Sequence, residues 1–216
     1  MERNLSHFLE SSAHFFIDGP AGALELKTQS NSANPSVVGI ICHPNPLQEG
    51  TMDNKGVHTT ARAFETSGAA SVRFNYRGVG KSAGEYGAIE GECDDMRAVV
   101  QWVKACAPDA RLWFAGFSFG AYIAAKVAEQ SQPEALLSIA PAVHLMDYRP
   151  LNPNCPWFVL RALEDEVVSA EEIYQWVQQS SAKIKCIDFP QSSHFFHGQL
   201  VKLRQTIETC FQTLDH

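Results

Sequence analysis

Short apolar runs alternate along the chain with longer stretches in which apolar residues recur every three or four positions. This alternation of strand and helix signals predicts an α/β fold, with a mostly parallel, twisted sheet and helices on both of its faces. Residues 14–18 and 24–29, separated by a turn at 19–22, predict an antiparallel N-terminal hairpin at one edge of the sheet. The predicted parallel strands lie near 37–42, 70–76, 111–117, 135–140, 157–163 and 183–189.

Three helical stretches carry an apolar stripe suited to packing on a sheet. The stripes comprise Val57, Thr60, Ala61 and Phe64; Met96, Val99, Val100 and Val103; and Leu200, Leu203, Ile207, Cys210, Phe211 and Leu214. With 216 residues, of which 45% are hydrophobic, the chain is long enough to bury one sizeable core. Because no repeat or low-complexity tract interrupts it, we expect a single domain over residues 1–216.

The segment Gly116-Phe117-Ser118-Phe119-Gly120 stands between the apolar run 112–115 and the alanine-rich, helix-competent stretch 121–129. A G-x-S-x-G pattern between a strand and a helix lifts a serine hydroxyl out of a sheet on a tight turn. The glycines leave room for the turn, and the N-terminus of the following helix favours a negatively charged oxygen nearby. The alternative is a glycine-rich turn with a capping serine, and the rest of the chain favours the nucleophile.

A serine nucleophile requires a histidine base and an acid that orients it, in the order serine, acid, histidine on a sheet of this type. The strand near 157–163 leads into an acidic loop with Glu164, Asp165 and Glu166, and the strand near 183–189 leads to His194. Both loops follow the C-terminal ends of strands, where open α/β sheets place their catalytic groups. The sequence therefore predicts a serine–acid–histidine triad.

Two histidines compete for the role of base. We favour His194 because it comes first after the strand, before Phe195 begins the last helix, whereas we expect His197 to pack on that helix or to face solvent. The His-x-x-His spacing also suggests a metal pair, but no Asp, Glu or Cys cluster at ligand spacing accompanies it. We expect no metal and no cofactor.

Three further motifs have specific spacings: His43-Pro44-Asn45-Pro46 with Gly50-Thr51-Met52-Asp53-Asn54-Lys55, then Arg73-Phe74-Asn75-Tyr76-Arg77-Gly78-Val79-Gly80-Lys81-Ser82, then His194-Phe195-Phe196-His197-Gly198. Together they resemble a family of small bacterial α/β-hydrolases that is similar to the dienelactone hydrolases but has a serine nucleophile. The chain departs from that family at Asn45, commonly histidine, and at Glu49, commonly glycine. The resemblance covers most of the chain from about Val37 and implies hydrolase chemistry without naming a substrate.

The resemblance also selects the acid. Residues 162–168 are similar to the G-x-x-D-x-x-V pattern of α/β-hydrolases, with Ala162 in the glycine position and Val168 in the valine position. This indicates Asp165 as the acid, with Glu164 as the alternative.

Acyl transfer needs two N–H donors for the oxyanion, and the first belongs to the residue after the nucleophile, Phe119. In α/β-hydrolases the second comes from the loop after the strand that corresponds to 37–42. Pro44 and Pro46 carry no N–H, so we expect Asn45 to be the donor, with Leu47 as the alternative. The alternative is that the two prolines only stiffen this turn and that it has no part in catalysis. We expect His43 to orient this loop by hydrogen bonding.

Larger α/β-hydrolases carry a helical cap after the strand that ends here near residue 140. Between Pro141 and Pro156 this chain has room only for a short loop. We therefore expect no cap domain and a shallow, open site. Its predicted walls are Phe117, Leu145, Met146 and Phe195, with Tyr86 as a further candidate.

Gly80-Lys81-Ser82 matches the end of a phosphate-binding loop, but the full pattern needs glycine where Asn75 stands. The six cysteines are scattered without a C-x-x-C pair, which is typical of reduced core residues in a cytoplasmic protein. A formal net charge of −7 without a basic block argues against nucleic acid or an anionic membrane as partner. No signal peptide or membrane-spanning run is apparent.

These observations predict a serine hydrolase that cleaves carboxylic esters of small, short-acyl substrates through an acyl-enzyme. A thioesterase or peptidase of the same fold is the alternative within the enzymes. A catalytically retired scaffold that acts as a binding protein is the alternative outside them, although such a scaffold would be expected to lose Ser118, Asp165 or His194.

Overall fold

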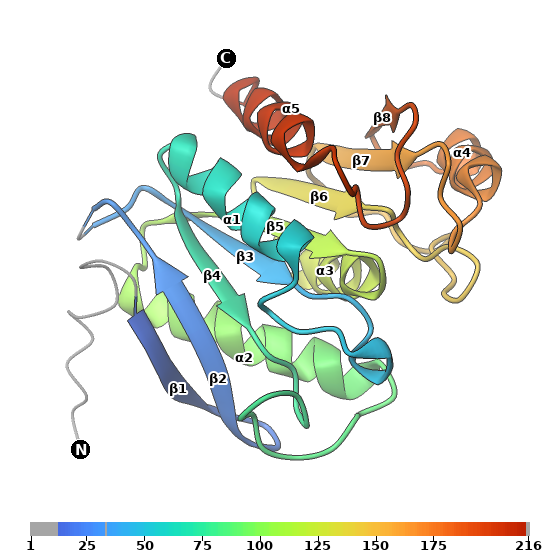
Figure 1. Cartoon of the computed structure of the whole chain (residues 1–216). Coiled ribbons are helices and arrows are strands. Elements are labelled where there is room, and N and C mark those ends of the chain that lie inside the picture. Colours follow the sequence, from blue (N-terminus) through green and yellow to red (C-terminus); the bar gives the residue numbers. More distant parts are fainter. Residues whose placement is uncertain (1–12, 33, 215–216) are drawn as a thin grey trace.

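The computed structural model describes residues 13–32 and 34–214, and a twisted sheet runs through its centre (Figure 1). In the described part of the chain the sheet has eight strands in the order β1-β2-β4-β3-β5-β6-β7-β8. Their bounds are β1 Ala13–Gly19, β2 Gly22–Gln29, β3 Val37–Cys42, β4 Ala70–Phe74, β5 Arg111–Phe117, β6 Ala135–Ile139, β7 Trp157–Ala162 and β8 Ile184–Phe189.

The first two strands form an antiparallel hairpin, and β2 pairs antiparallel with β4. All further pairs in the order from β4 to β8 are parallel. This confirms the predicted α/β-hydrolase fold with its N-terminal hairpin at one edge of the sheet. The parallel strands end in close register, since Cys42 pairs with Gly116, Phe117 with Ile139, and Ile139 with Leu160. The segments that follow these strands therefore start from one edge of the sheet.

Helices cover both faces of the sheet, as predicted (Figure 1). One face holds α1 (Lys55–Thr66) and α5 (Leu200–Gln212), whose buried residues share one apolar cluster with β3, β5, β6 and β7. The other face holds α2 (Glu90–Cys106), α3 (Phe119–Ser131) and α4 (Ala170–Gln179), which contribute to a second cluster.

Aromatic contacts join the first layer of helices to the sheet. The Phe211 ring of α5 lies 4.8 Å from Phe64 of α1 and 4.4 Å from Trp113 of β5. All three side chains are buried, and each contributes on the order of 2–3 kcal/mol by leaving water. The start of α1 is fixed locally, because the Asn54 side chain accepts hydrogen bonds from the N–H groups of Gly56 and Val57.

The connection between β6 and β7 contains turns and bends, and no helix lies within residues 140–156. This confirms the predicted absence of a cap domain. One prediction about the last helix is wrong, because α5 begins at Leu200 and not at Phe195. Phe196 and Gly198 adopt left-handed backbone conformations, with φ of 53° and 74°, which a right-handed helix cannot contain.

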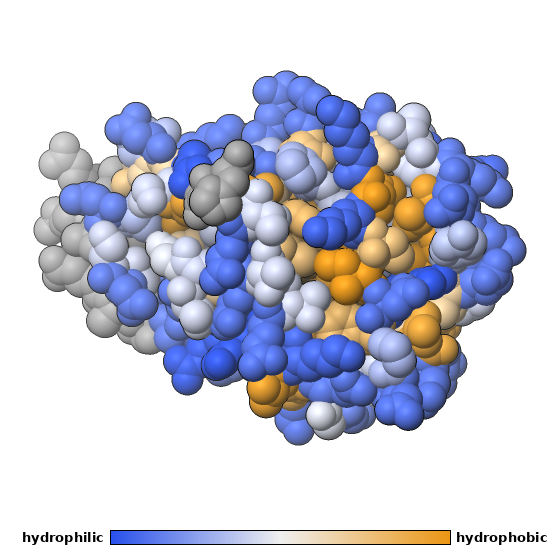
Figure 2. Space-filling model, turned by 90° about the horizontal axis from the view of Figure 1, so that it is seen from above, coloured by the Kyte–Doolittle hydropathy of each residue, from blue (hydrophilic) through white to orange (hydrophobic). Residues whose placement is uncertain are grey.

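Figure 2 shows the face of the molecule that lies on top in Figure 1. Hydrophilic residues cover much of this face, and apolar side chains gather in the middle and right of the view. Among the helices of the described residues, none combines the length and the apolar character that crossing a bilayer requires.

Candidate active site

Ser118 occupies the turn between β5 and α3 in a strained backbone conformation. Its φ of 53° and ψ of −112° lie outside the regions that L-residues normally adopt, and such strain persists only where the surroundings impose it. Here the Ser118 N–H donates to the Ile139 carbonyl of β6 at 2.8 Å, which ties the turn to the neighbouring strand. Helix α3 begins at the next residue, and the free N–H groups of its first turn point towards this turn.

The glycines on either side of this turn are required by close backbone contacts. A Cβ atom at Gly116 would lie 2.1 Å from the Gly120 carbonyl oxygen. A Cβ atom at Gly120 would lie 2.4 Å from the carbonyl oxygen of Cys42 and 2.5 Å from that of His43. The contacts of Gly120 bring the end of β3 against the start of α3, so the loop after β3 and the serine turn share one packing constraint.

Asp165 and His194 form a buried pair at the ends of β7 and β8. The Asp165 Oδ2 atom lies 2.8 Å from His194 Nδ1, and the two side chains are 0% and 3% exposed. The other carboxylate oxygen accepts hydrogen bonds of 2.8 Å from the N–H groups of Val167 and Val168. Burial alone would raise the pKa of Asp165, but the hydrogen bonds from His194, Val168 and Val167 outweigh burial and lower the pKa. Asp165 is therefore a carboxylate at neutral pH.

The neighbouring carboxylates have other surroundings. Glu164 is exposed, and its N–H donates to the Ser192 carbonyl at 3.0 Å. Glu166 accepts a 3.1 Å hydrogen bond from the backbone N–H of His194. The acidic loop thus holds His194 at two points, its ring through Asp165 and its main chain through Glu166. The second contact joins residues 28 positions apart, so no local sequence pattern predicts it.

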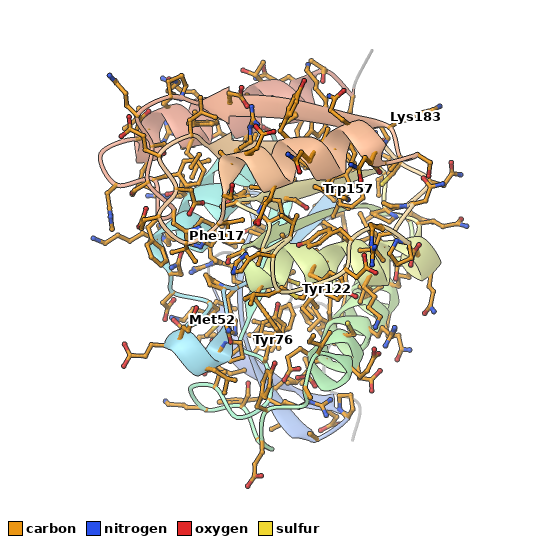
Figure 3. All side chains as sticks on the ribbon, turned by 90° about the vertical axis from the view of Figure 1, so that its right-hand side faces the viewer. Met52, Tyr76, Phe117, Tyr122, Trp157 and Lys183 are labelled. Atoms are coloured by element: carbon orange, nitrogen blue, oxygen red, sulfur yellow. The ribbon has the colours of Figure 1, made fainter. Side chains whose placement is uncertain are left out.

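His194 lies beside the serine turn. Its ring centroid is 5.6 Å from that of Phe117, the residue before Ser118. In Figure 3, Phe117 lies on the same side of the molecule as Met52 and opposite Lys183, which precedes β8. Within the described residues, the Ser118 hydroxyl makes no hydrogen bond to the imidazole. The structure thus brings acid and histidine into contact and leaves the serine beside them.

In the loop after β3, the two candidate oxyanion donors, the N–H groups of Asn45 and Leu47, differ in whether they already have a partner. The Asn45 side-chain oxygen accepts the Leu47 N–H at 2.9 Å, at the start of the short helix Pro46–Gln48, so the Leu47 donor is occupied. The Asn45 N–H has no partner among the described residues. Glu49 ends this helix with a φ of 59°, a conformation that glycine adopts without strain. This accounts for the glycine that is common there in the related family.

His43 fixes the orientation of the same loop. Its Nε2 atom accepts the Tyr76 N–H at 3.2 Å, so the proton resides on Nδ1, which donates to the Pro44 carbonyl at 2.7 Å. Burial lowers the pKa of His43 to about 3. The Pro44 carbonyl and the Asn45 N–H belong to one planar peptide unit, so a bond that holds the carbonyl also holds the direction of that N–H.

The predicted walls of the site lie in two places. Phe117 is buried and stacks with the exposed Phe195 at a centroid distance of 6.1 Å, and the Phe195 and His194 rings meet edge to face with their centroids 4.9 Å apart. The ring centroids of Tyr86 and Phe119 are 6.4 Å apart. Leu145 and Met146, by contrast, line a cavity beside α4 that none of Ser118, Asp165 and His194 lines. This cavity therefore does not place Leu145 and Met146 beside the serine turn.

The structure also shows the surroundings of two other motifs, the His-x-x-His pair and the Gly78–Ser82 turn. His197 is exposed, and the described residues contain no group of three or more His, Cys, Asp or Glu side chains that could hold a metal ion. In the Gly78–Ser82 turn, the Lys81 N–H donates to the Glu25 carboxylate at 2.8 Å, and the Ser82 hydroxyl donates to the Asn75 carbonyl at 2.7 Å. A carboxylate stands where a phosphate-binding loop would hold its anion.

Comparisons with known proteins agree with this architecture. The sequence model of the family described as serine aminopeptidase, S33 matches residues 52–188, a range that includes Ser118 and Asp165 and ends before His194. An α/β serine hydrolase homologue from Coxiella burnetii is 42% identical, with a TM-score of 0.90 over 94% of this chain and 98% of that one. A lidless α/β serine hydrolase from Xanthomonas campestris is 38% identical, with a TM-score of 0.89 over 94% of both chains.

A dienelactone hydrolase from Anabaena variabilis shares the fold at 13% identity, with a TM-score of 0.77 over 94% of this chain and 99% of that one. The resemblance stated from the sequence motifs is thereby confirmed at the level of the family. The serine turn at the end of β5, the sheet order and these matches lead to one conclusion: the chain belongs to the serine aminopeptidase S33 family of α/β serine hydrolases and is a hydrolase.

Proposed function

We propose that this hydrolase cleaves carboxylic esters of small, short-acyl substrates through an acyl-enzyme, with Ser118, Asp165 and His194 as its triad. The observation that carries the proposal is the buried Asp165–His194 hydrogen bond of 2.8 Å beside a serine held at a φ of 53°. A carboxylate on Nδ1 directs the free Nε2 lone pair outward, which is the arrangement a general base requires.

In the first half of the reaction, Ser118 Oγ attacks the ester carbonyl carbon while His194 Nε2 takes the hydroxyl proton. The carbonyl oxygen becomes an oxyanion, and the N–H groups of Phe119 and Asn45 donate to it. His194 then passes its proton to the alcohol oxygen as the C–O bond breaks, and the alcohol leaves. Hydrogen bonds of this kind commonly tighten only when the substrate is bound, so the absent Ser118–His194 bond is compatible with the role.

In the second half, water takes the place of the alcohol. His194 removes a proton from the water as its oxygen attacks the acyl carbon, the same two N–H groups hold the oxyanion, and the Ser118 oxygen leaves with the proton returned by His194. The carboxylic acid product departs and the enzyme is restored. No step draws on a metal or an organic cofactor.

Esters are the substrates that demand least beyond these groups. Phe117 and Phe195 are proposed as the wall beside the acyl group, because their stacked rings lie against the His194 imidazole. Leu145 and Met146 are proposed as more distant substrate contacts. An amide has a poorer leaving group, and a peptidase would also need groups that hold the peptide ends.

Covalent labelling with a fluorophosphonate tests the proposal. Wild type should take one label, and Ser118→Ala should take none and lose at least about 10⁴ in kcat, as triad deletions typically do. Ser193→Ala is the matched control, since this serine directly precedes His194 and its hydroxyl has no hydrogen-bond partner among the described residues. It should keep both label and activity.

The bond type is decided by a panel of p-nitrophenyl acetate, an acetyl thioester and an aminoacyl p-nitroanilide. We expect the highest kcat/KM on the ester. Labelling of Ser118→Ala would move the nucleophile elsewhere, and a clear preference for the anilide would replace the esterase by an aminopeptidase.

A further inference from the structure

A groove of about 230 Å³ lies on the surface between α1 and α5, the two helices that cover one face of the sheet. The two helices lie next to each other and run in the same direction (Figure 1). Residues three and four positions apart lie on the same side of a helix, so each helix presents one short row of side chains to the groove. The row from α1 is His58, Thr59 and Arg62, and the row from α5 is Leu200, Val201 and Arg204.

The charge of this groove is opposite to that of the chain as a whole. The sequence contains 24 acidic and 17 basic residues, which gives a formal net charge of −7. Among the described residues that line the groove, two are arginines, one is a histidine and none is acidic. The groove is therefore a basic patch on an acidic protein, and a ligand held there by charge would be an anion.

Both guanidinium groups are accessible to such a ligand. The side chain of Arg62 is 56% exposed and that of Arg204 is 46% exposed. Each has an acidic partner on its own helix, with Glu65 at 3.9 Å from Arg62 and Glu208 at 3.2 Å from Arg204. These two carboxylates are only 9% and 15% exposed and do not line the groove. Since a guanidinium carries five N–H donors, both arginines keep donors for a molecule in the groove.

The surroundings of His58 show that the electrostatic potential in this part of the surface is positive. Burial lowers the pKa of His58 below its ordinary value, and the positive charges of Arg73 and Arg62 lower it further. Asp53 opposes this shift, and Lys27 adds to it. Three cations on β2, β4 and α1 thus act against one carboxylate, and the field that disfavours a protonated imidazole favours a bound anion.

The α5 side of the groove adds an apolar contact. Val201 is 69% exposed, and Leu200 beside it is half-buried. The volume of the groove lies below the roughly 300–1,000 Å³ of sites for drug-sized ligands, so a molecule that fits it is small. Phosphate and carboxylate oxygens both match the planar fork of a guanidinium group, which can donate two parallel hydrogen bonds to either.

We propose that this groove binds a small anion with a phosphoryl or carboxylate head and a short alkyl group. Arg62 and Arg204 hold the head from the two helices, with the His58 imidazole beside it, and the alkyl group covers Val201. None of Ser118, Asp165 and His194 lines the groove. The proposal therefore does not depend on the proposed esterase activity.

Binding is tested on the wild-type protein at low ionic strength by following the arginine Nε–Hε signals in heteronuclear NMR spectra. Arg62→Gln and Arg204→Gln assign the two groove signals. Three probes share a propyl group and differ in the head: propylphosphonate, butyrate and the neutral n-butanol. Inorganic phosphate supplies the head without the alkyl group. We expect one or both propyl anions to shift both groove signals with a millimolar Kd, at least about tenfold tighter than n-butanol and about threefold tighter than inorganic phosphate.

The same two substitutions then place the ligand. Each should weaken binding at least about fivefold, measured on the arginine signal that remains, because each removes one charge-assisted contact. Arg97→Gln is the matched control and should leave binding unchanged, since Arg97 also pairs with an acidic residue of its own helix, Asp94 at 2.7 Å, but lies on α2. Tighter binding of propylphosphonate assigns a phosphoryl head to the ligand, and tighter binding of butyrate assigns a carboxylate.

Three results would overturn the proposal. Neither propyl anion shifts the groove signals at tens of millimolar; n-butanol or inorganic phosphate binds as tightly as the propyl anions; or Arg97→Gln weakens binding as much as Arg62→Gln. The last result would show that the anion responds to the overall charge of the protein and not to this groove.

Discussion

At the scale of single residues, the acidic loop offers a direct comparison between two adjacent carboxylates. Asp165→Asn should leave the fold intact and lower kcat by on the order of 10⁴, because an amide N–H opposite Nδ1 favours the wrong imidazole tautomer. Glu164→Gln should change kcat little, since Glu164 is exposed and only its backbone N–H is engaged nearby. Steady-state kinetics on p-nitrophenyl acetate measures both, and reversed effects would assign the role of acid to Glu164.

His43 should make the stability of the protein depend on pH. Its pKa of about 3 in the folded state lies below the ordinary value of about 6.5, so folding favours the neutral ring. The stability that this preference contributes is complete above about pH 6.5 and is lost as the pH falls towards 3, at up to about 1.4 kcal/mol per pH unit. Protonation of Nε2 would also break the bond from the Tyr76 N–H.

Urea unfolding at pH 6.5 and pH 5 checks this prediction. Wild type should lose about 1.6 kcal/mol more of its free energy of unfolding over that interval than His43→Phe, which has no imidazole to titrate. Equal losses in the two proteins would mean that His43 is not the group responsible.

Residue-scale features differ in how far the sequence could predict them. The Gly-x-Ser-x-Gly pattern and the chain order led to Ser118 and His194, the resemblance of residues 162–168 to the family pattern selected Asp165, and Asp165 and His194 lie in contact. The Glu166 bond to the His194 backbone was not predicted, and neither was the Glu25 carboxylate that binds Asn75 and Lys81. Such contacts join residues more than 25 positions apart through a backbone or a single side chain, and no local periodicity encodes them.

At the scale of elements, the packing of α3 against β3 gives a prediction about Gly120. Replacing glycine by alanine inside a helix normally stabilises it by up to about 1 kcal/mol. Here the new methyl group would collide with the carbonyls of Cys42 and His43, so Gly120→Ala should instead cost about 2 kcal/mol or more. It should also lower kcat/KM at least tenfold, because the collision displaces the loop that carries Asn45.

Gly68→Ala is the control for this substitution. A methyl group there meets nothing within 4 Å, although φ is 84°, so it should cost about 1 kcal/mol through backbone strain alone and leave kcat/KM unchanged. Thermal melts and esterase kinetics on both variants separate collision from strain. Equal effects of the two substitutions would refute the shared constraint between β3 and α3.

Elements with regular patterns were predicted closely. The strands Val37–Cys42 and Arg111–Phe117 have the predicted bounds, because each contains six consecutive buried residues that the sequence shows as one apolar run. The start of the last helix was misplaced by five residues, from Phe195 to Leu200. Phe196 and Gly198 both have left-handed backbone conformations and the Phe196 ring is buried, so the helix starts only after this turn.

At the scale of the whole molecule, the short β6–β7 connection limits how much of a substrate can be covered. Each methylene contributes about 0.8 kcal/mol to binding only while a wall removes it from water. We therefore expect kcat/KM on p-nitrophenyl esters to peak between acetate and butyrate and to flatten or fall for longer chains. A preference for palmitate would contradict the open site.

The same architecture predicts no interfacial activation, because residues 140–156 contain no helix that could act as a lid. Rates measured across the critical micelle concentration of a short-chain ester should rise smoothly. An abrupt increase at micelle formation would indicate that the segment around Leu145 moves.

The order of elements along the chain has a consequence for synthesis. Ser118 and its strained turn follow β5, whereas His194 comes after β8, the last strand to join the sheet. A nascent chain that has emerged only as far as α4 contains Ser118 and Asp165, but not His194. Under the proposed mechanism the polypeptide stays inert until β8 has paired with β7 and His194 is in place. Fragments released prematurely before that point would not hydrolyse the esters around them.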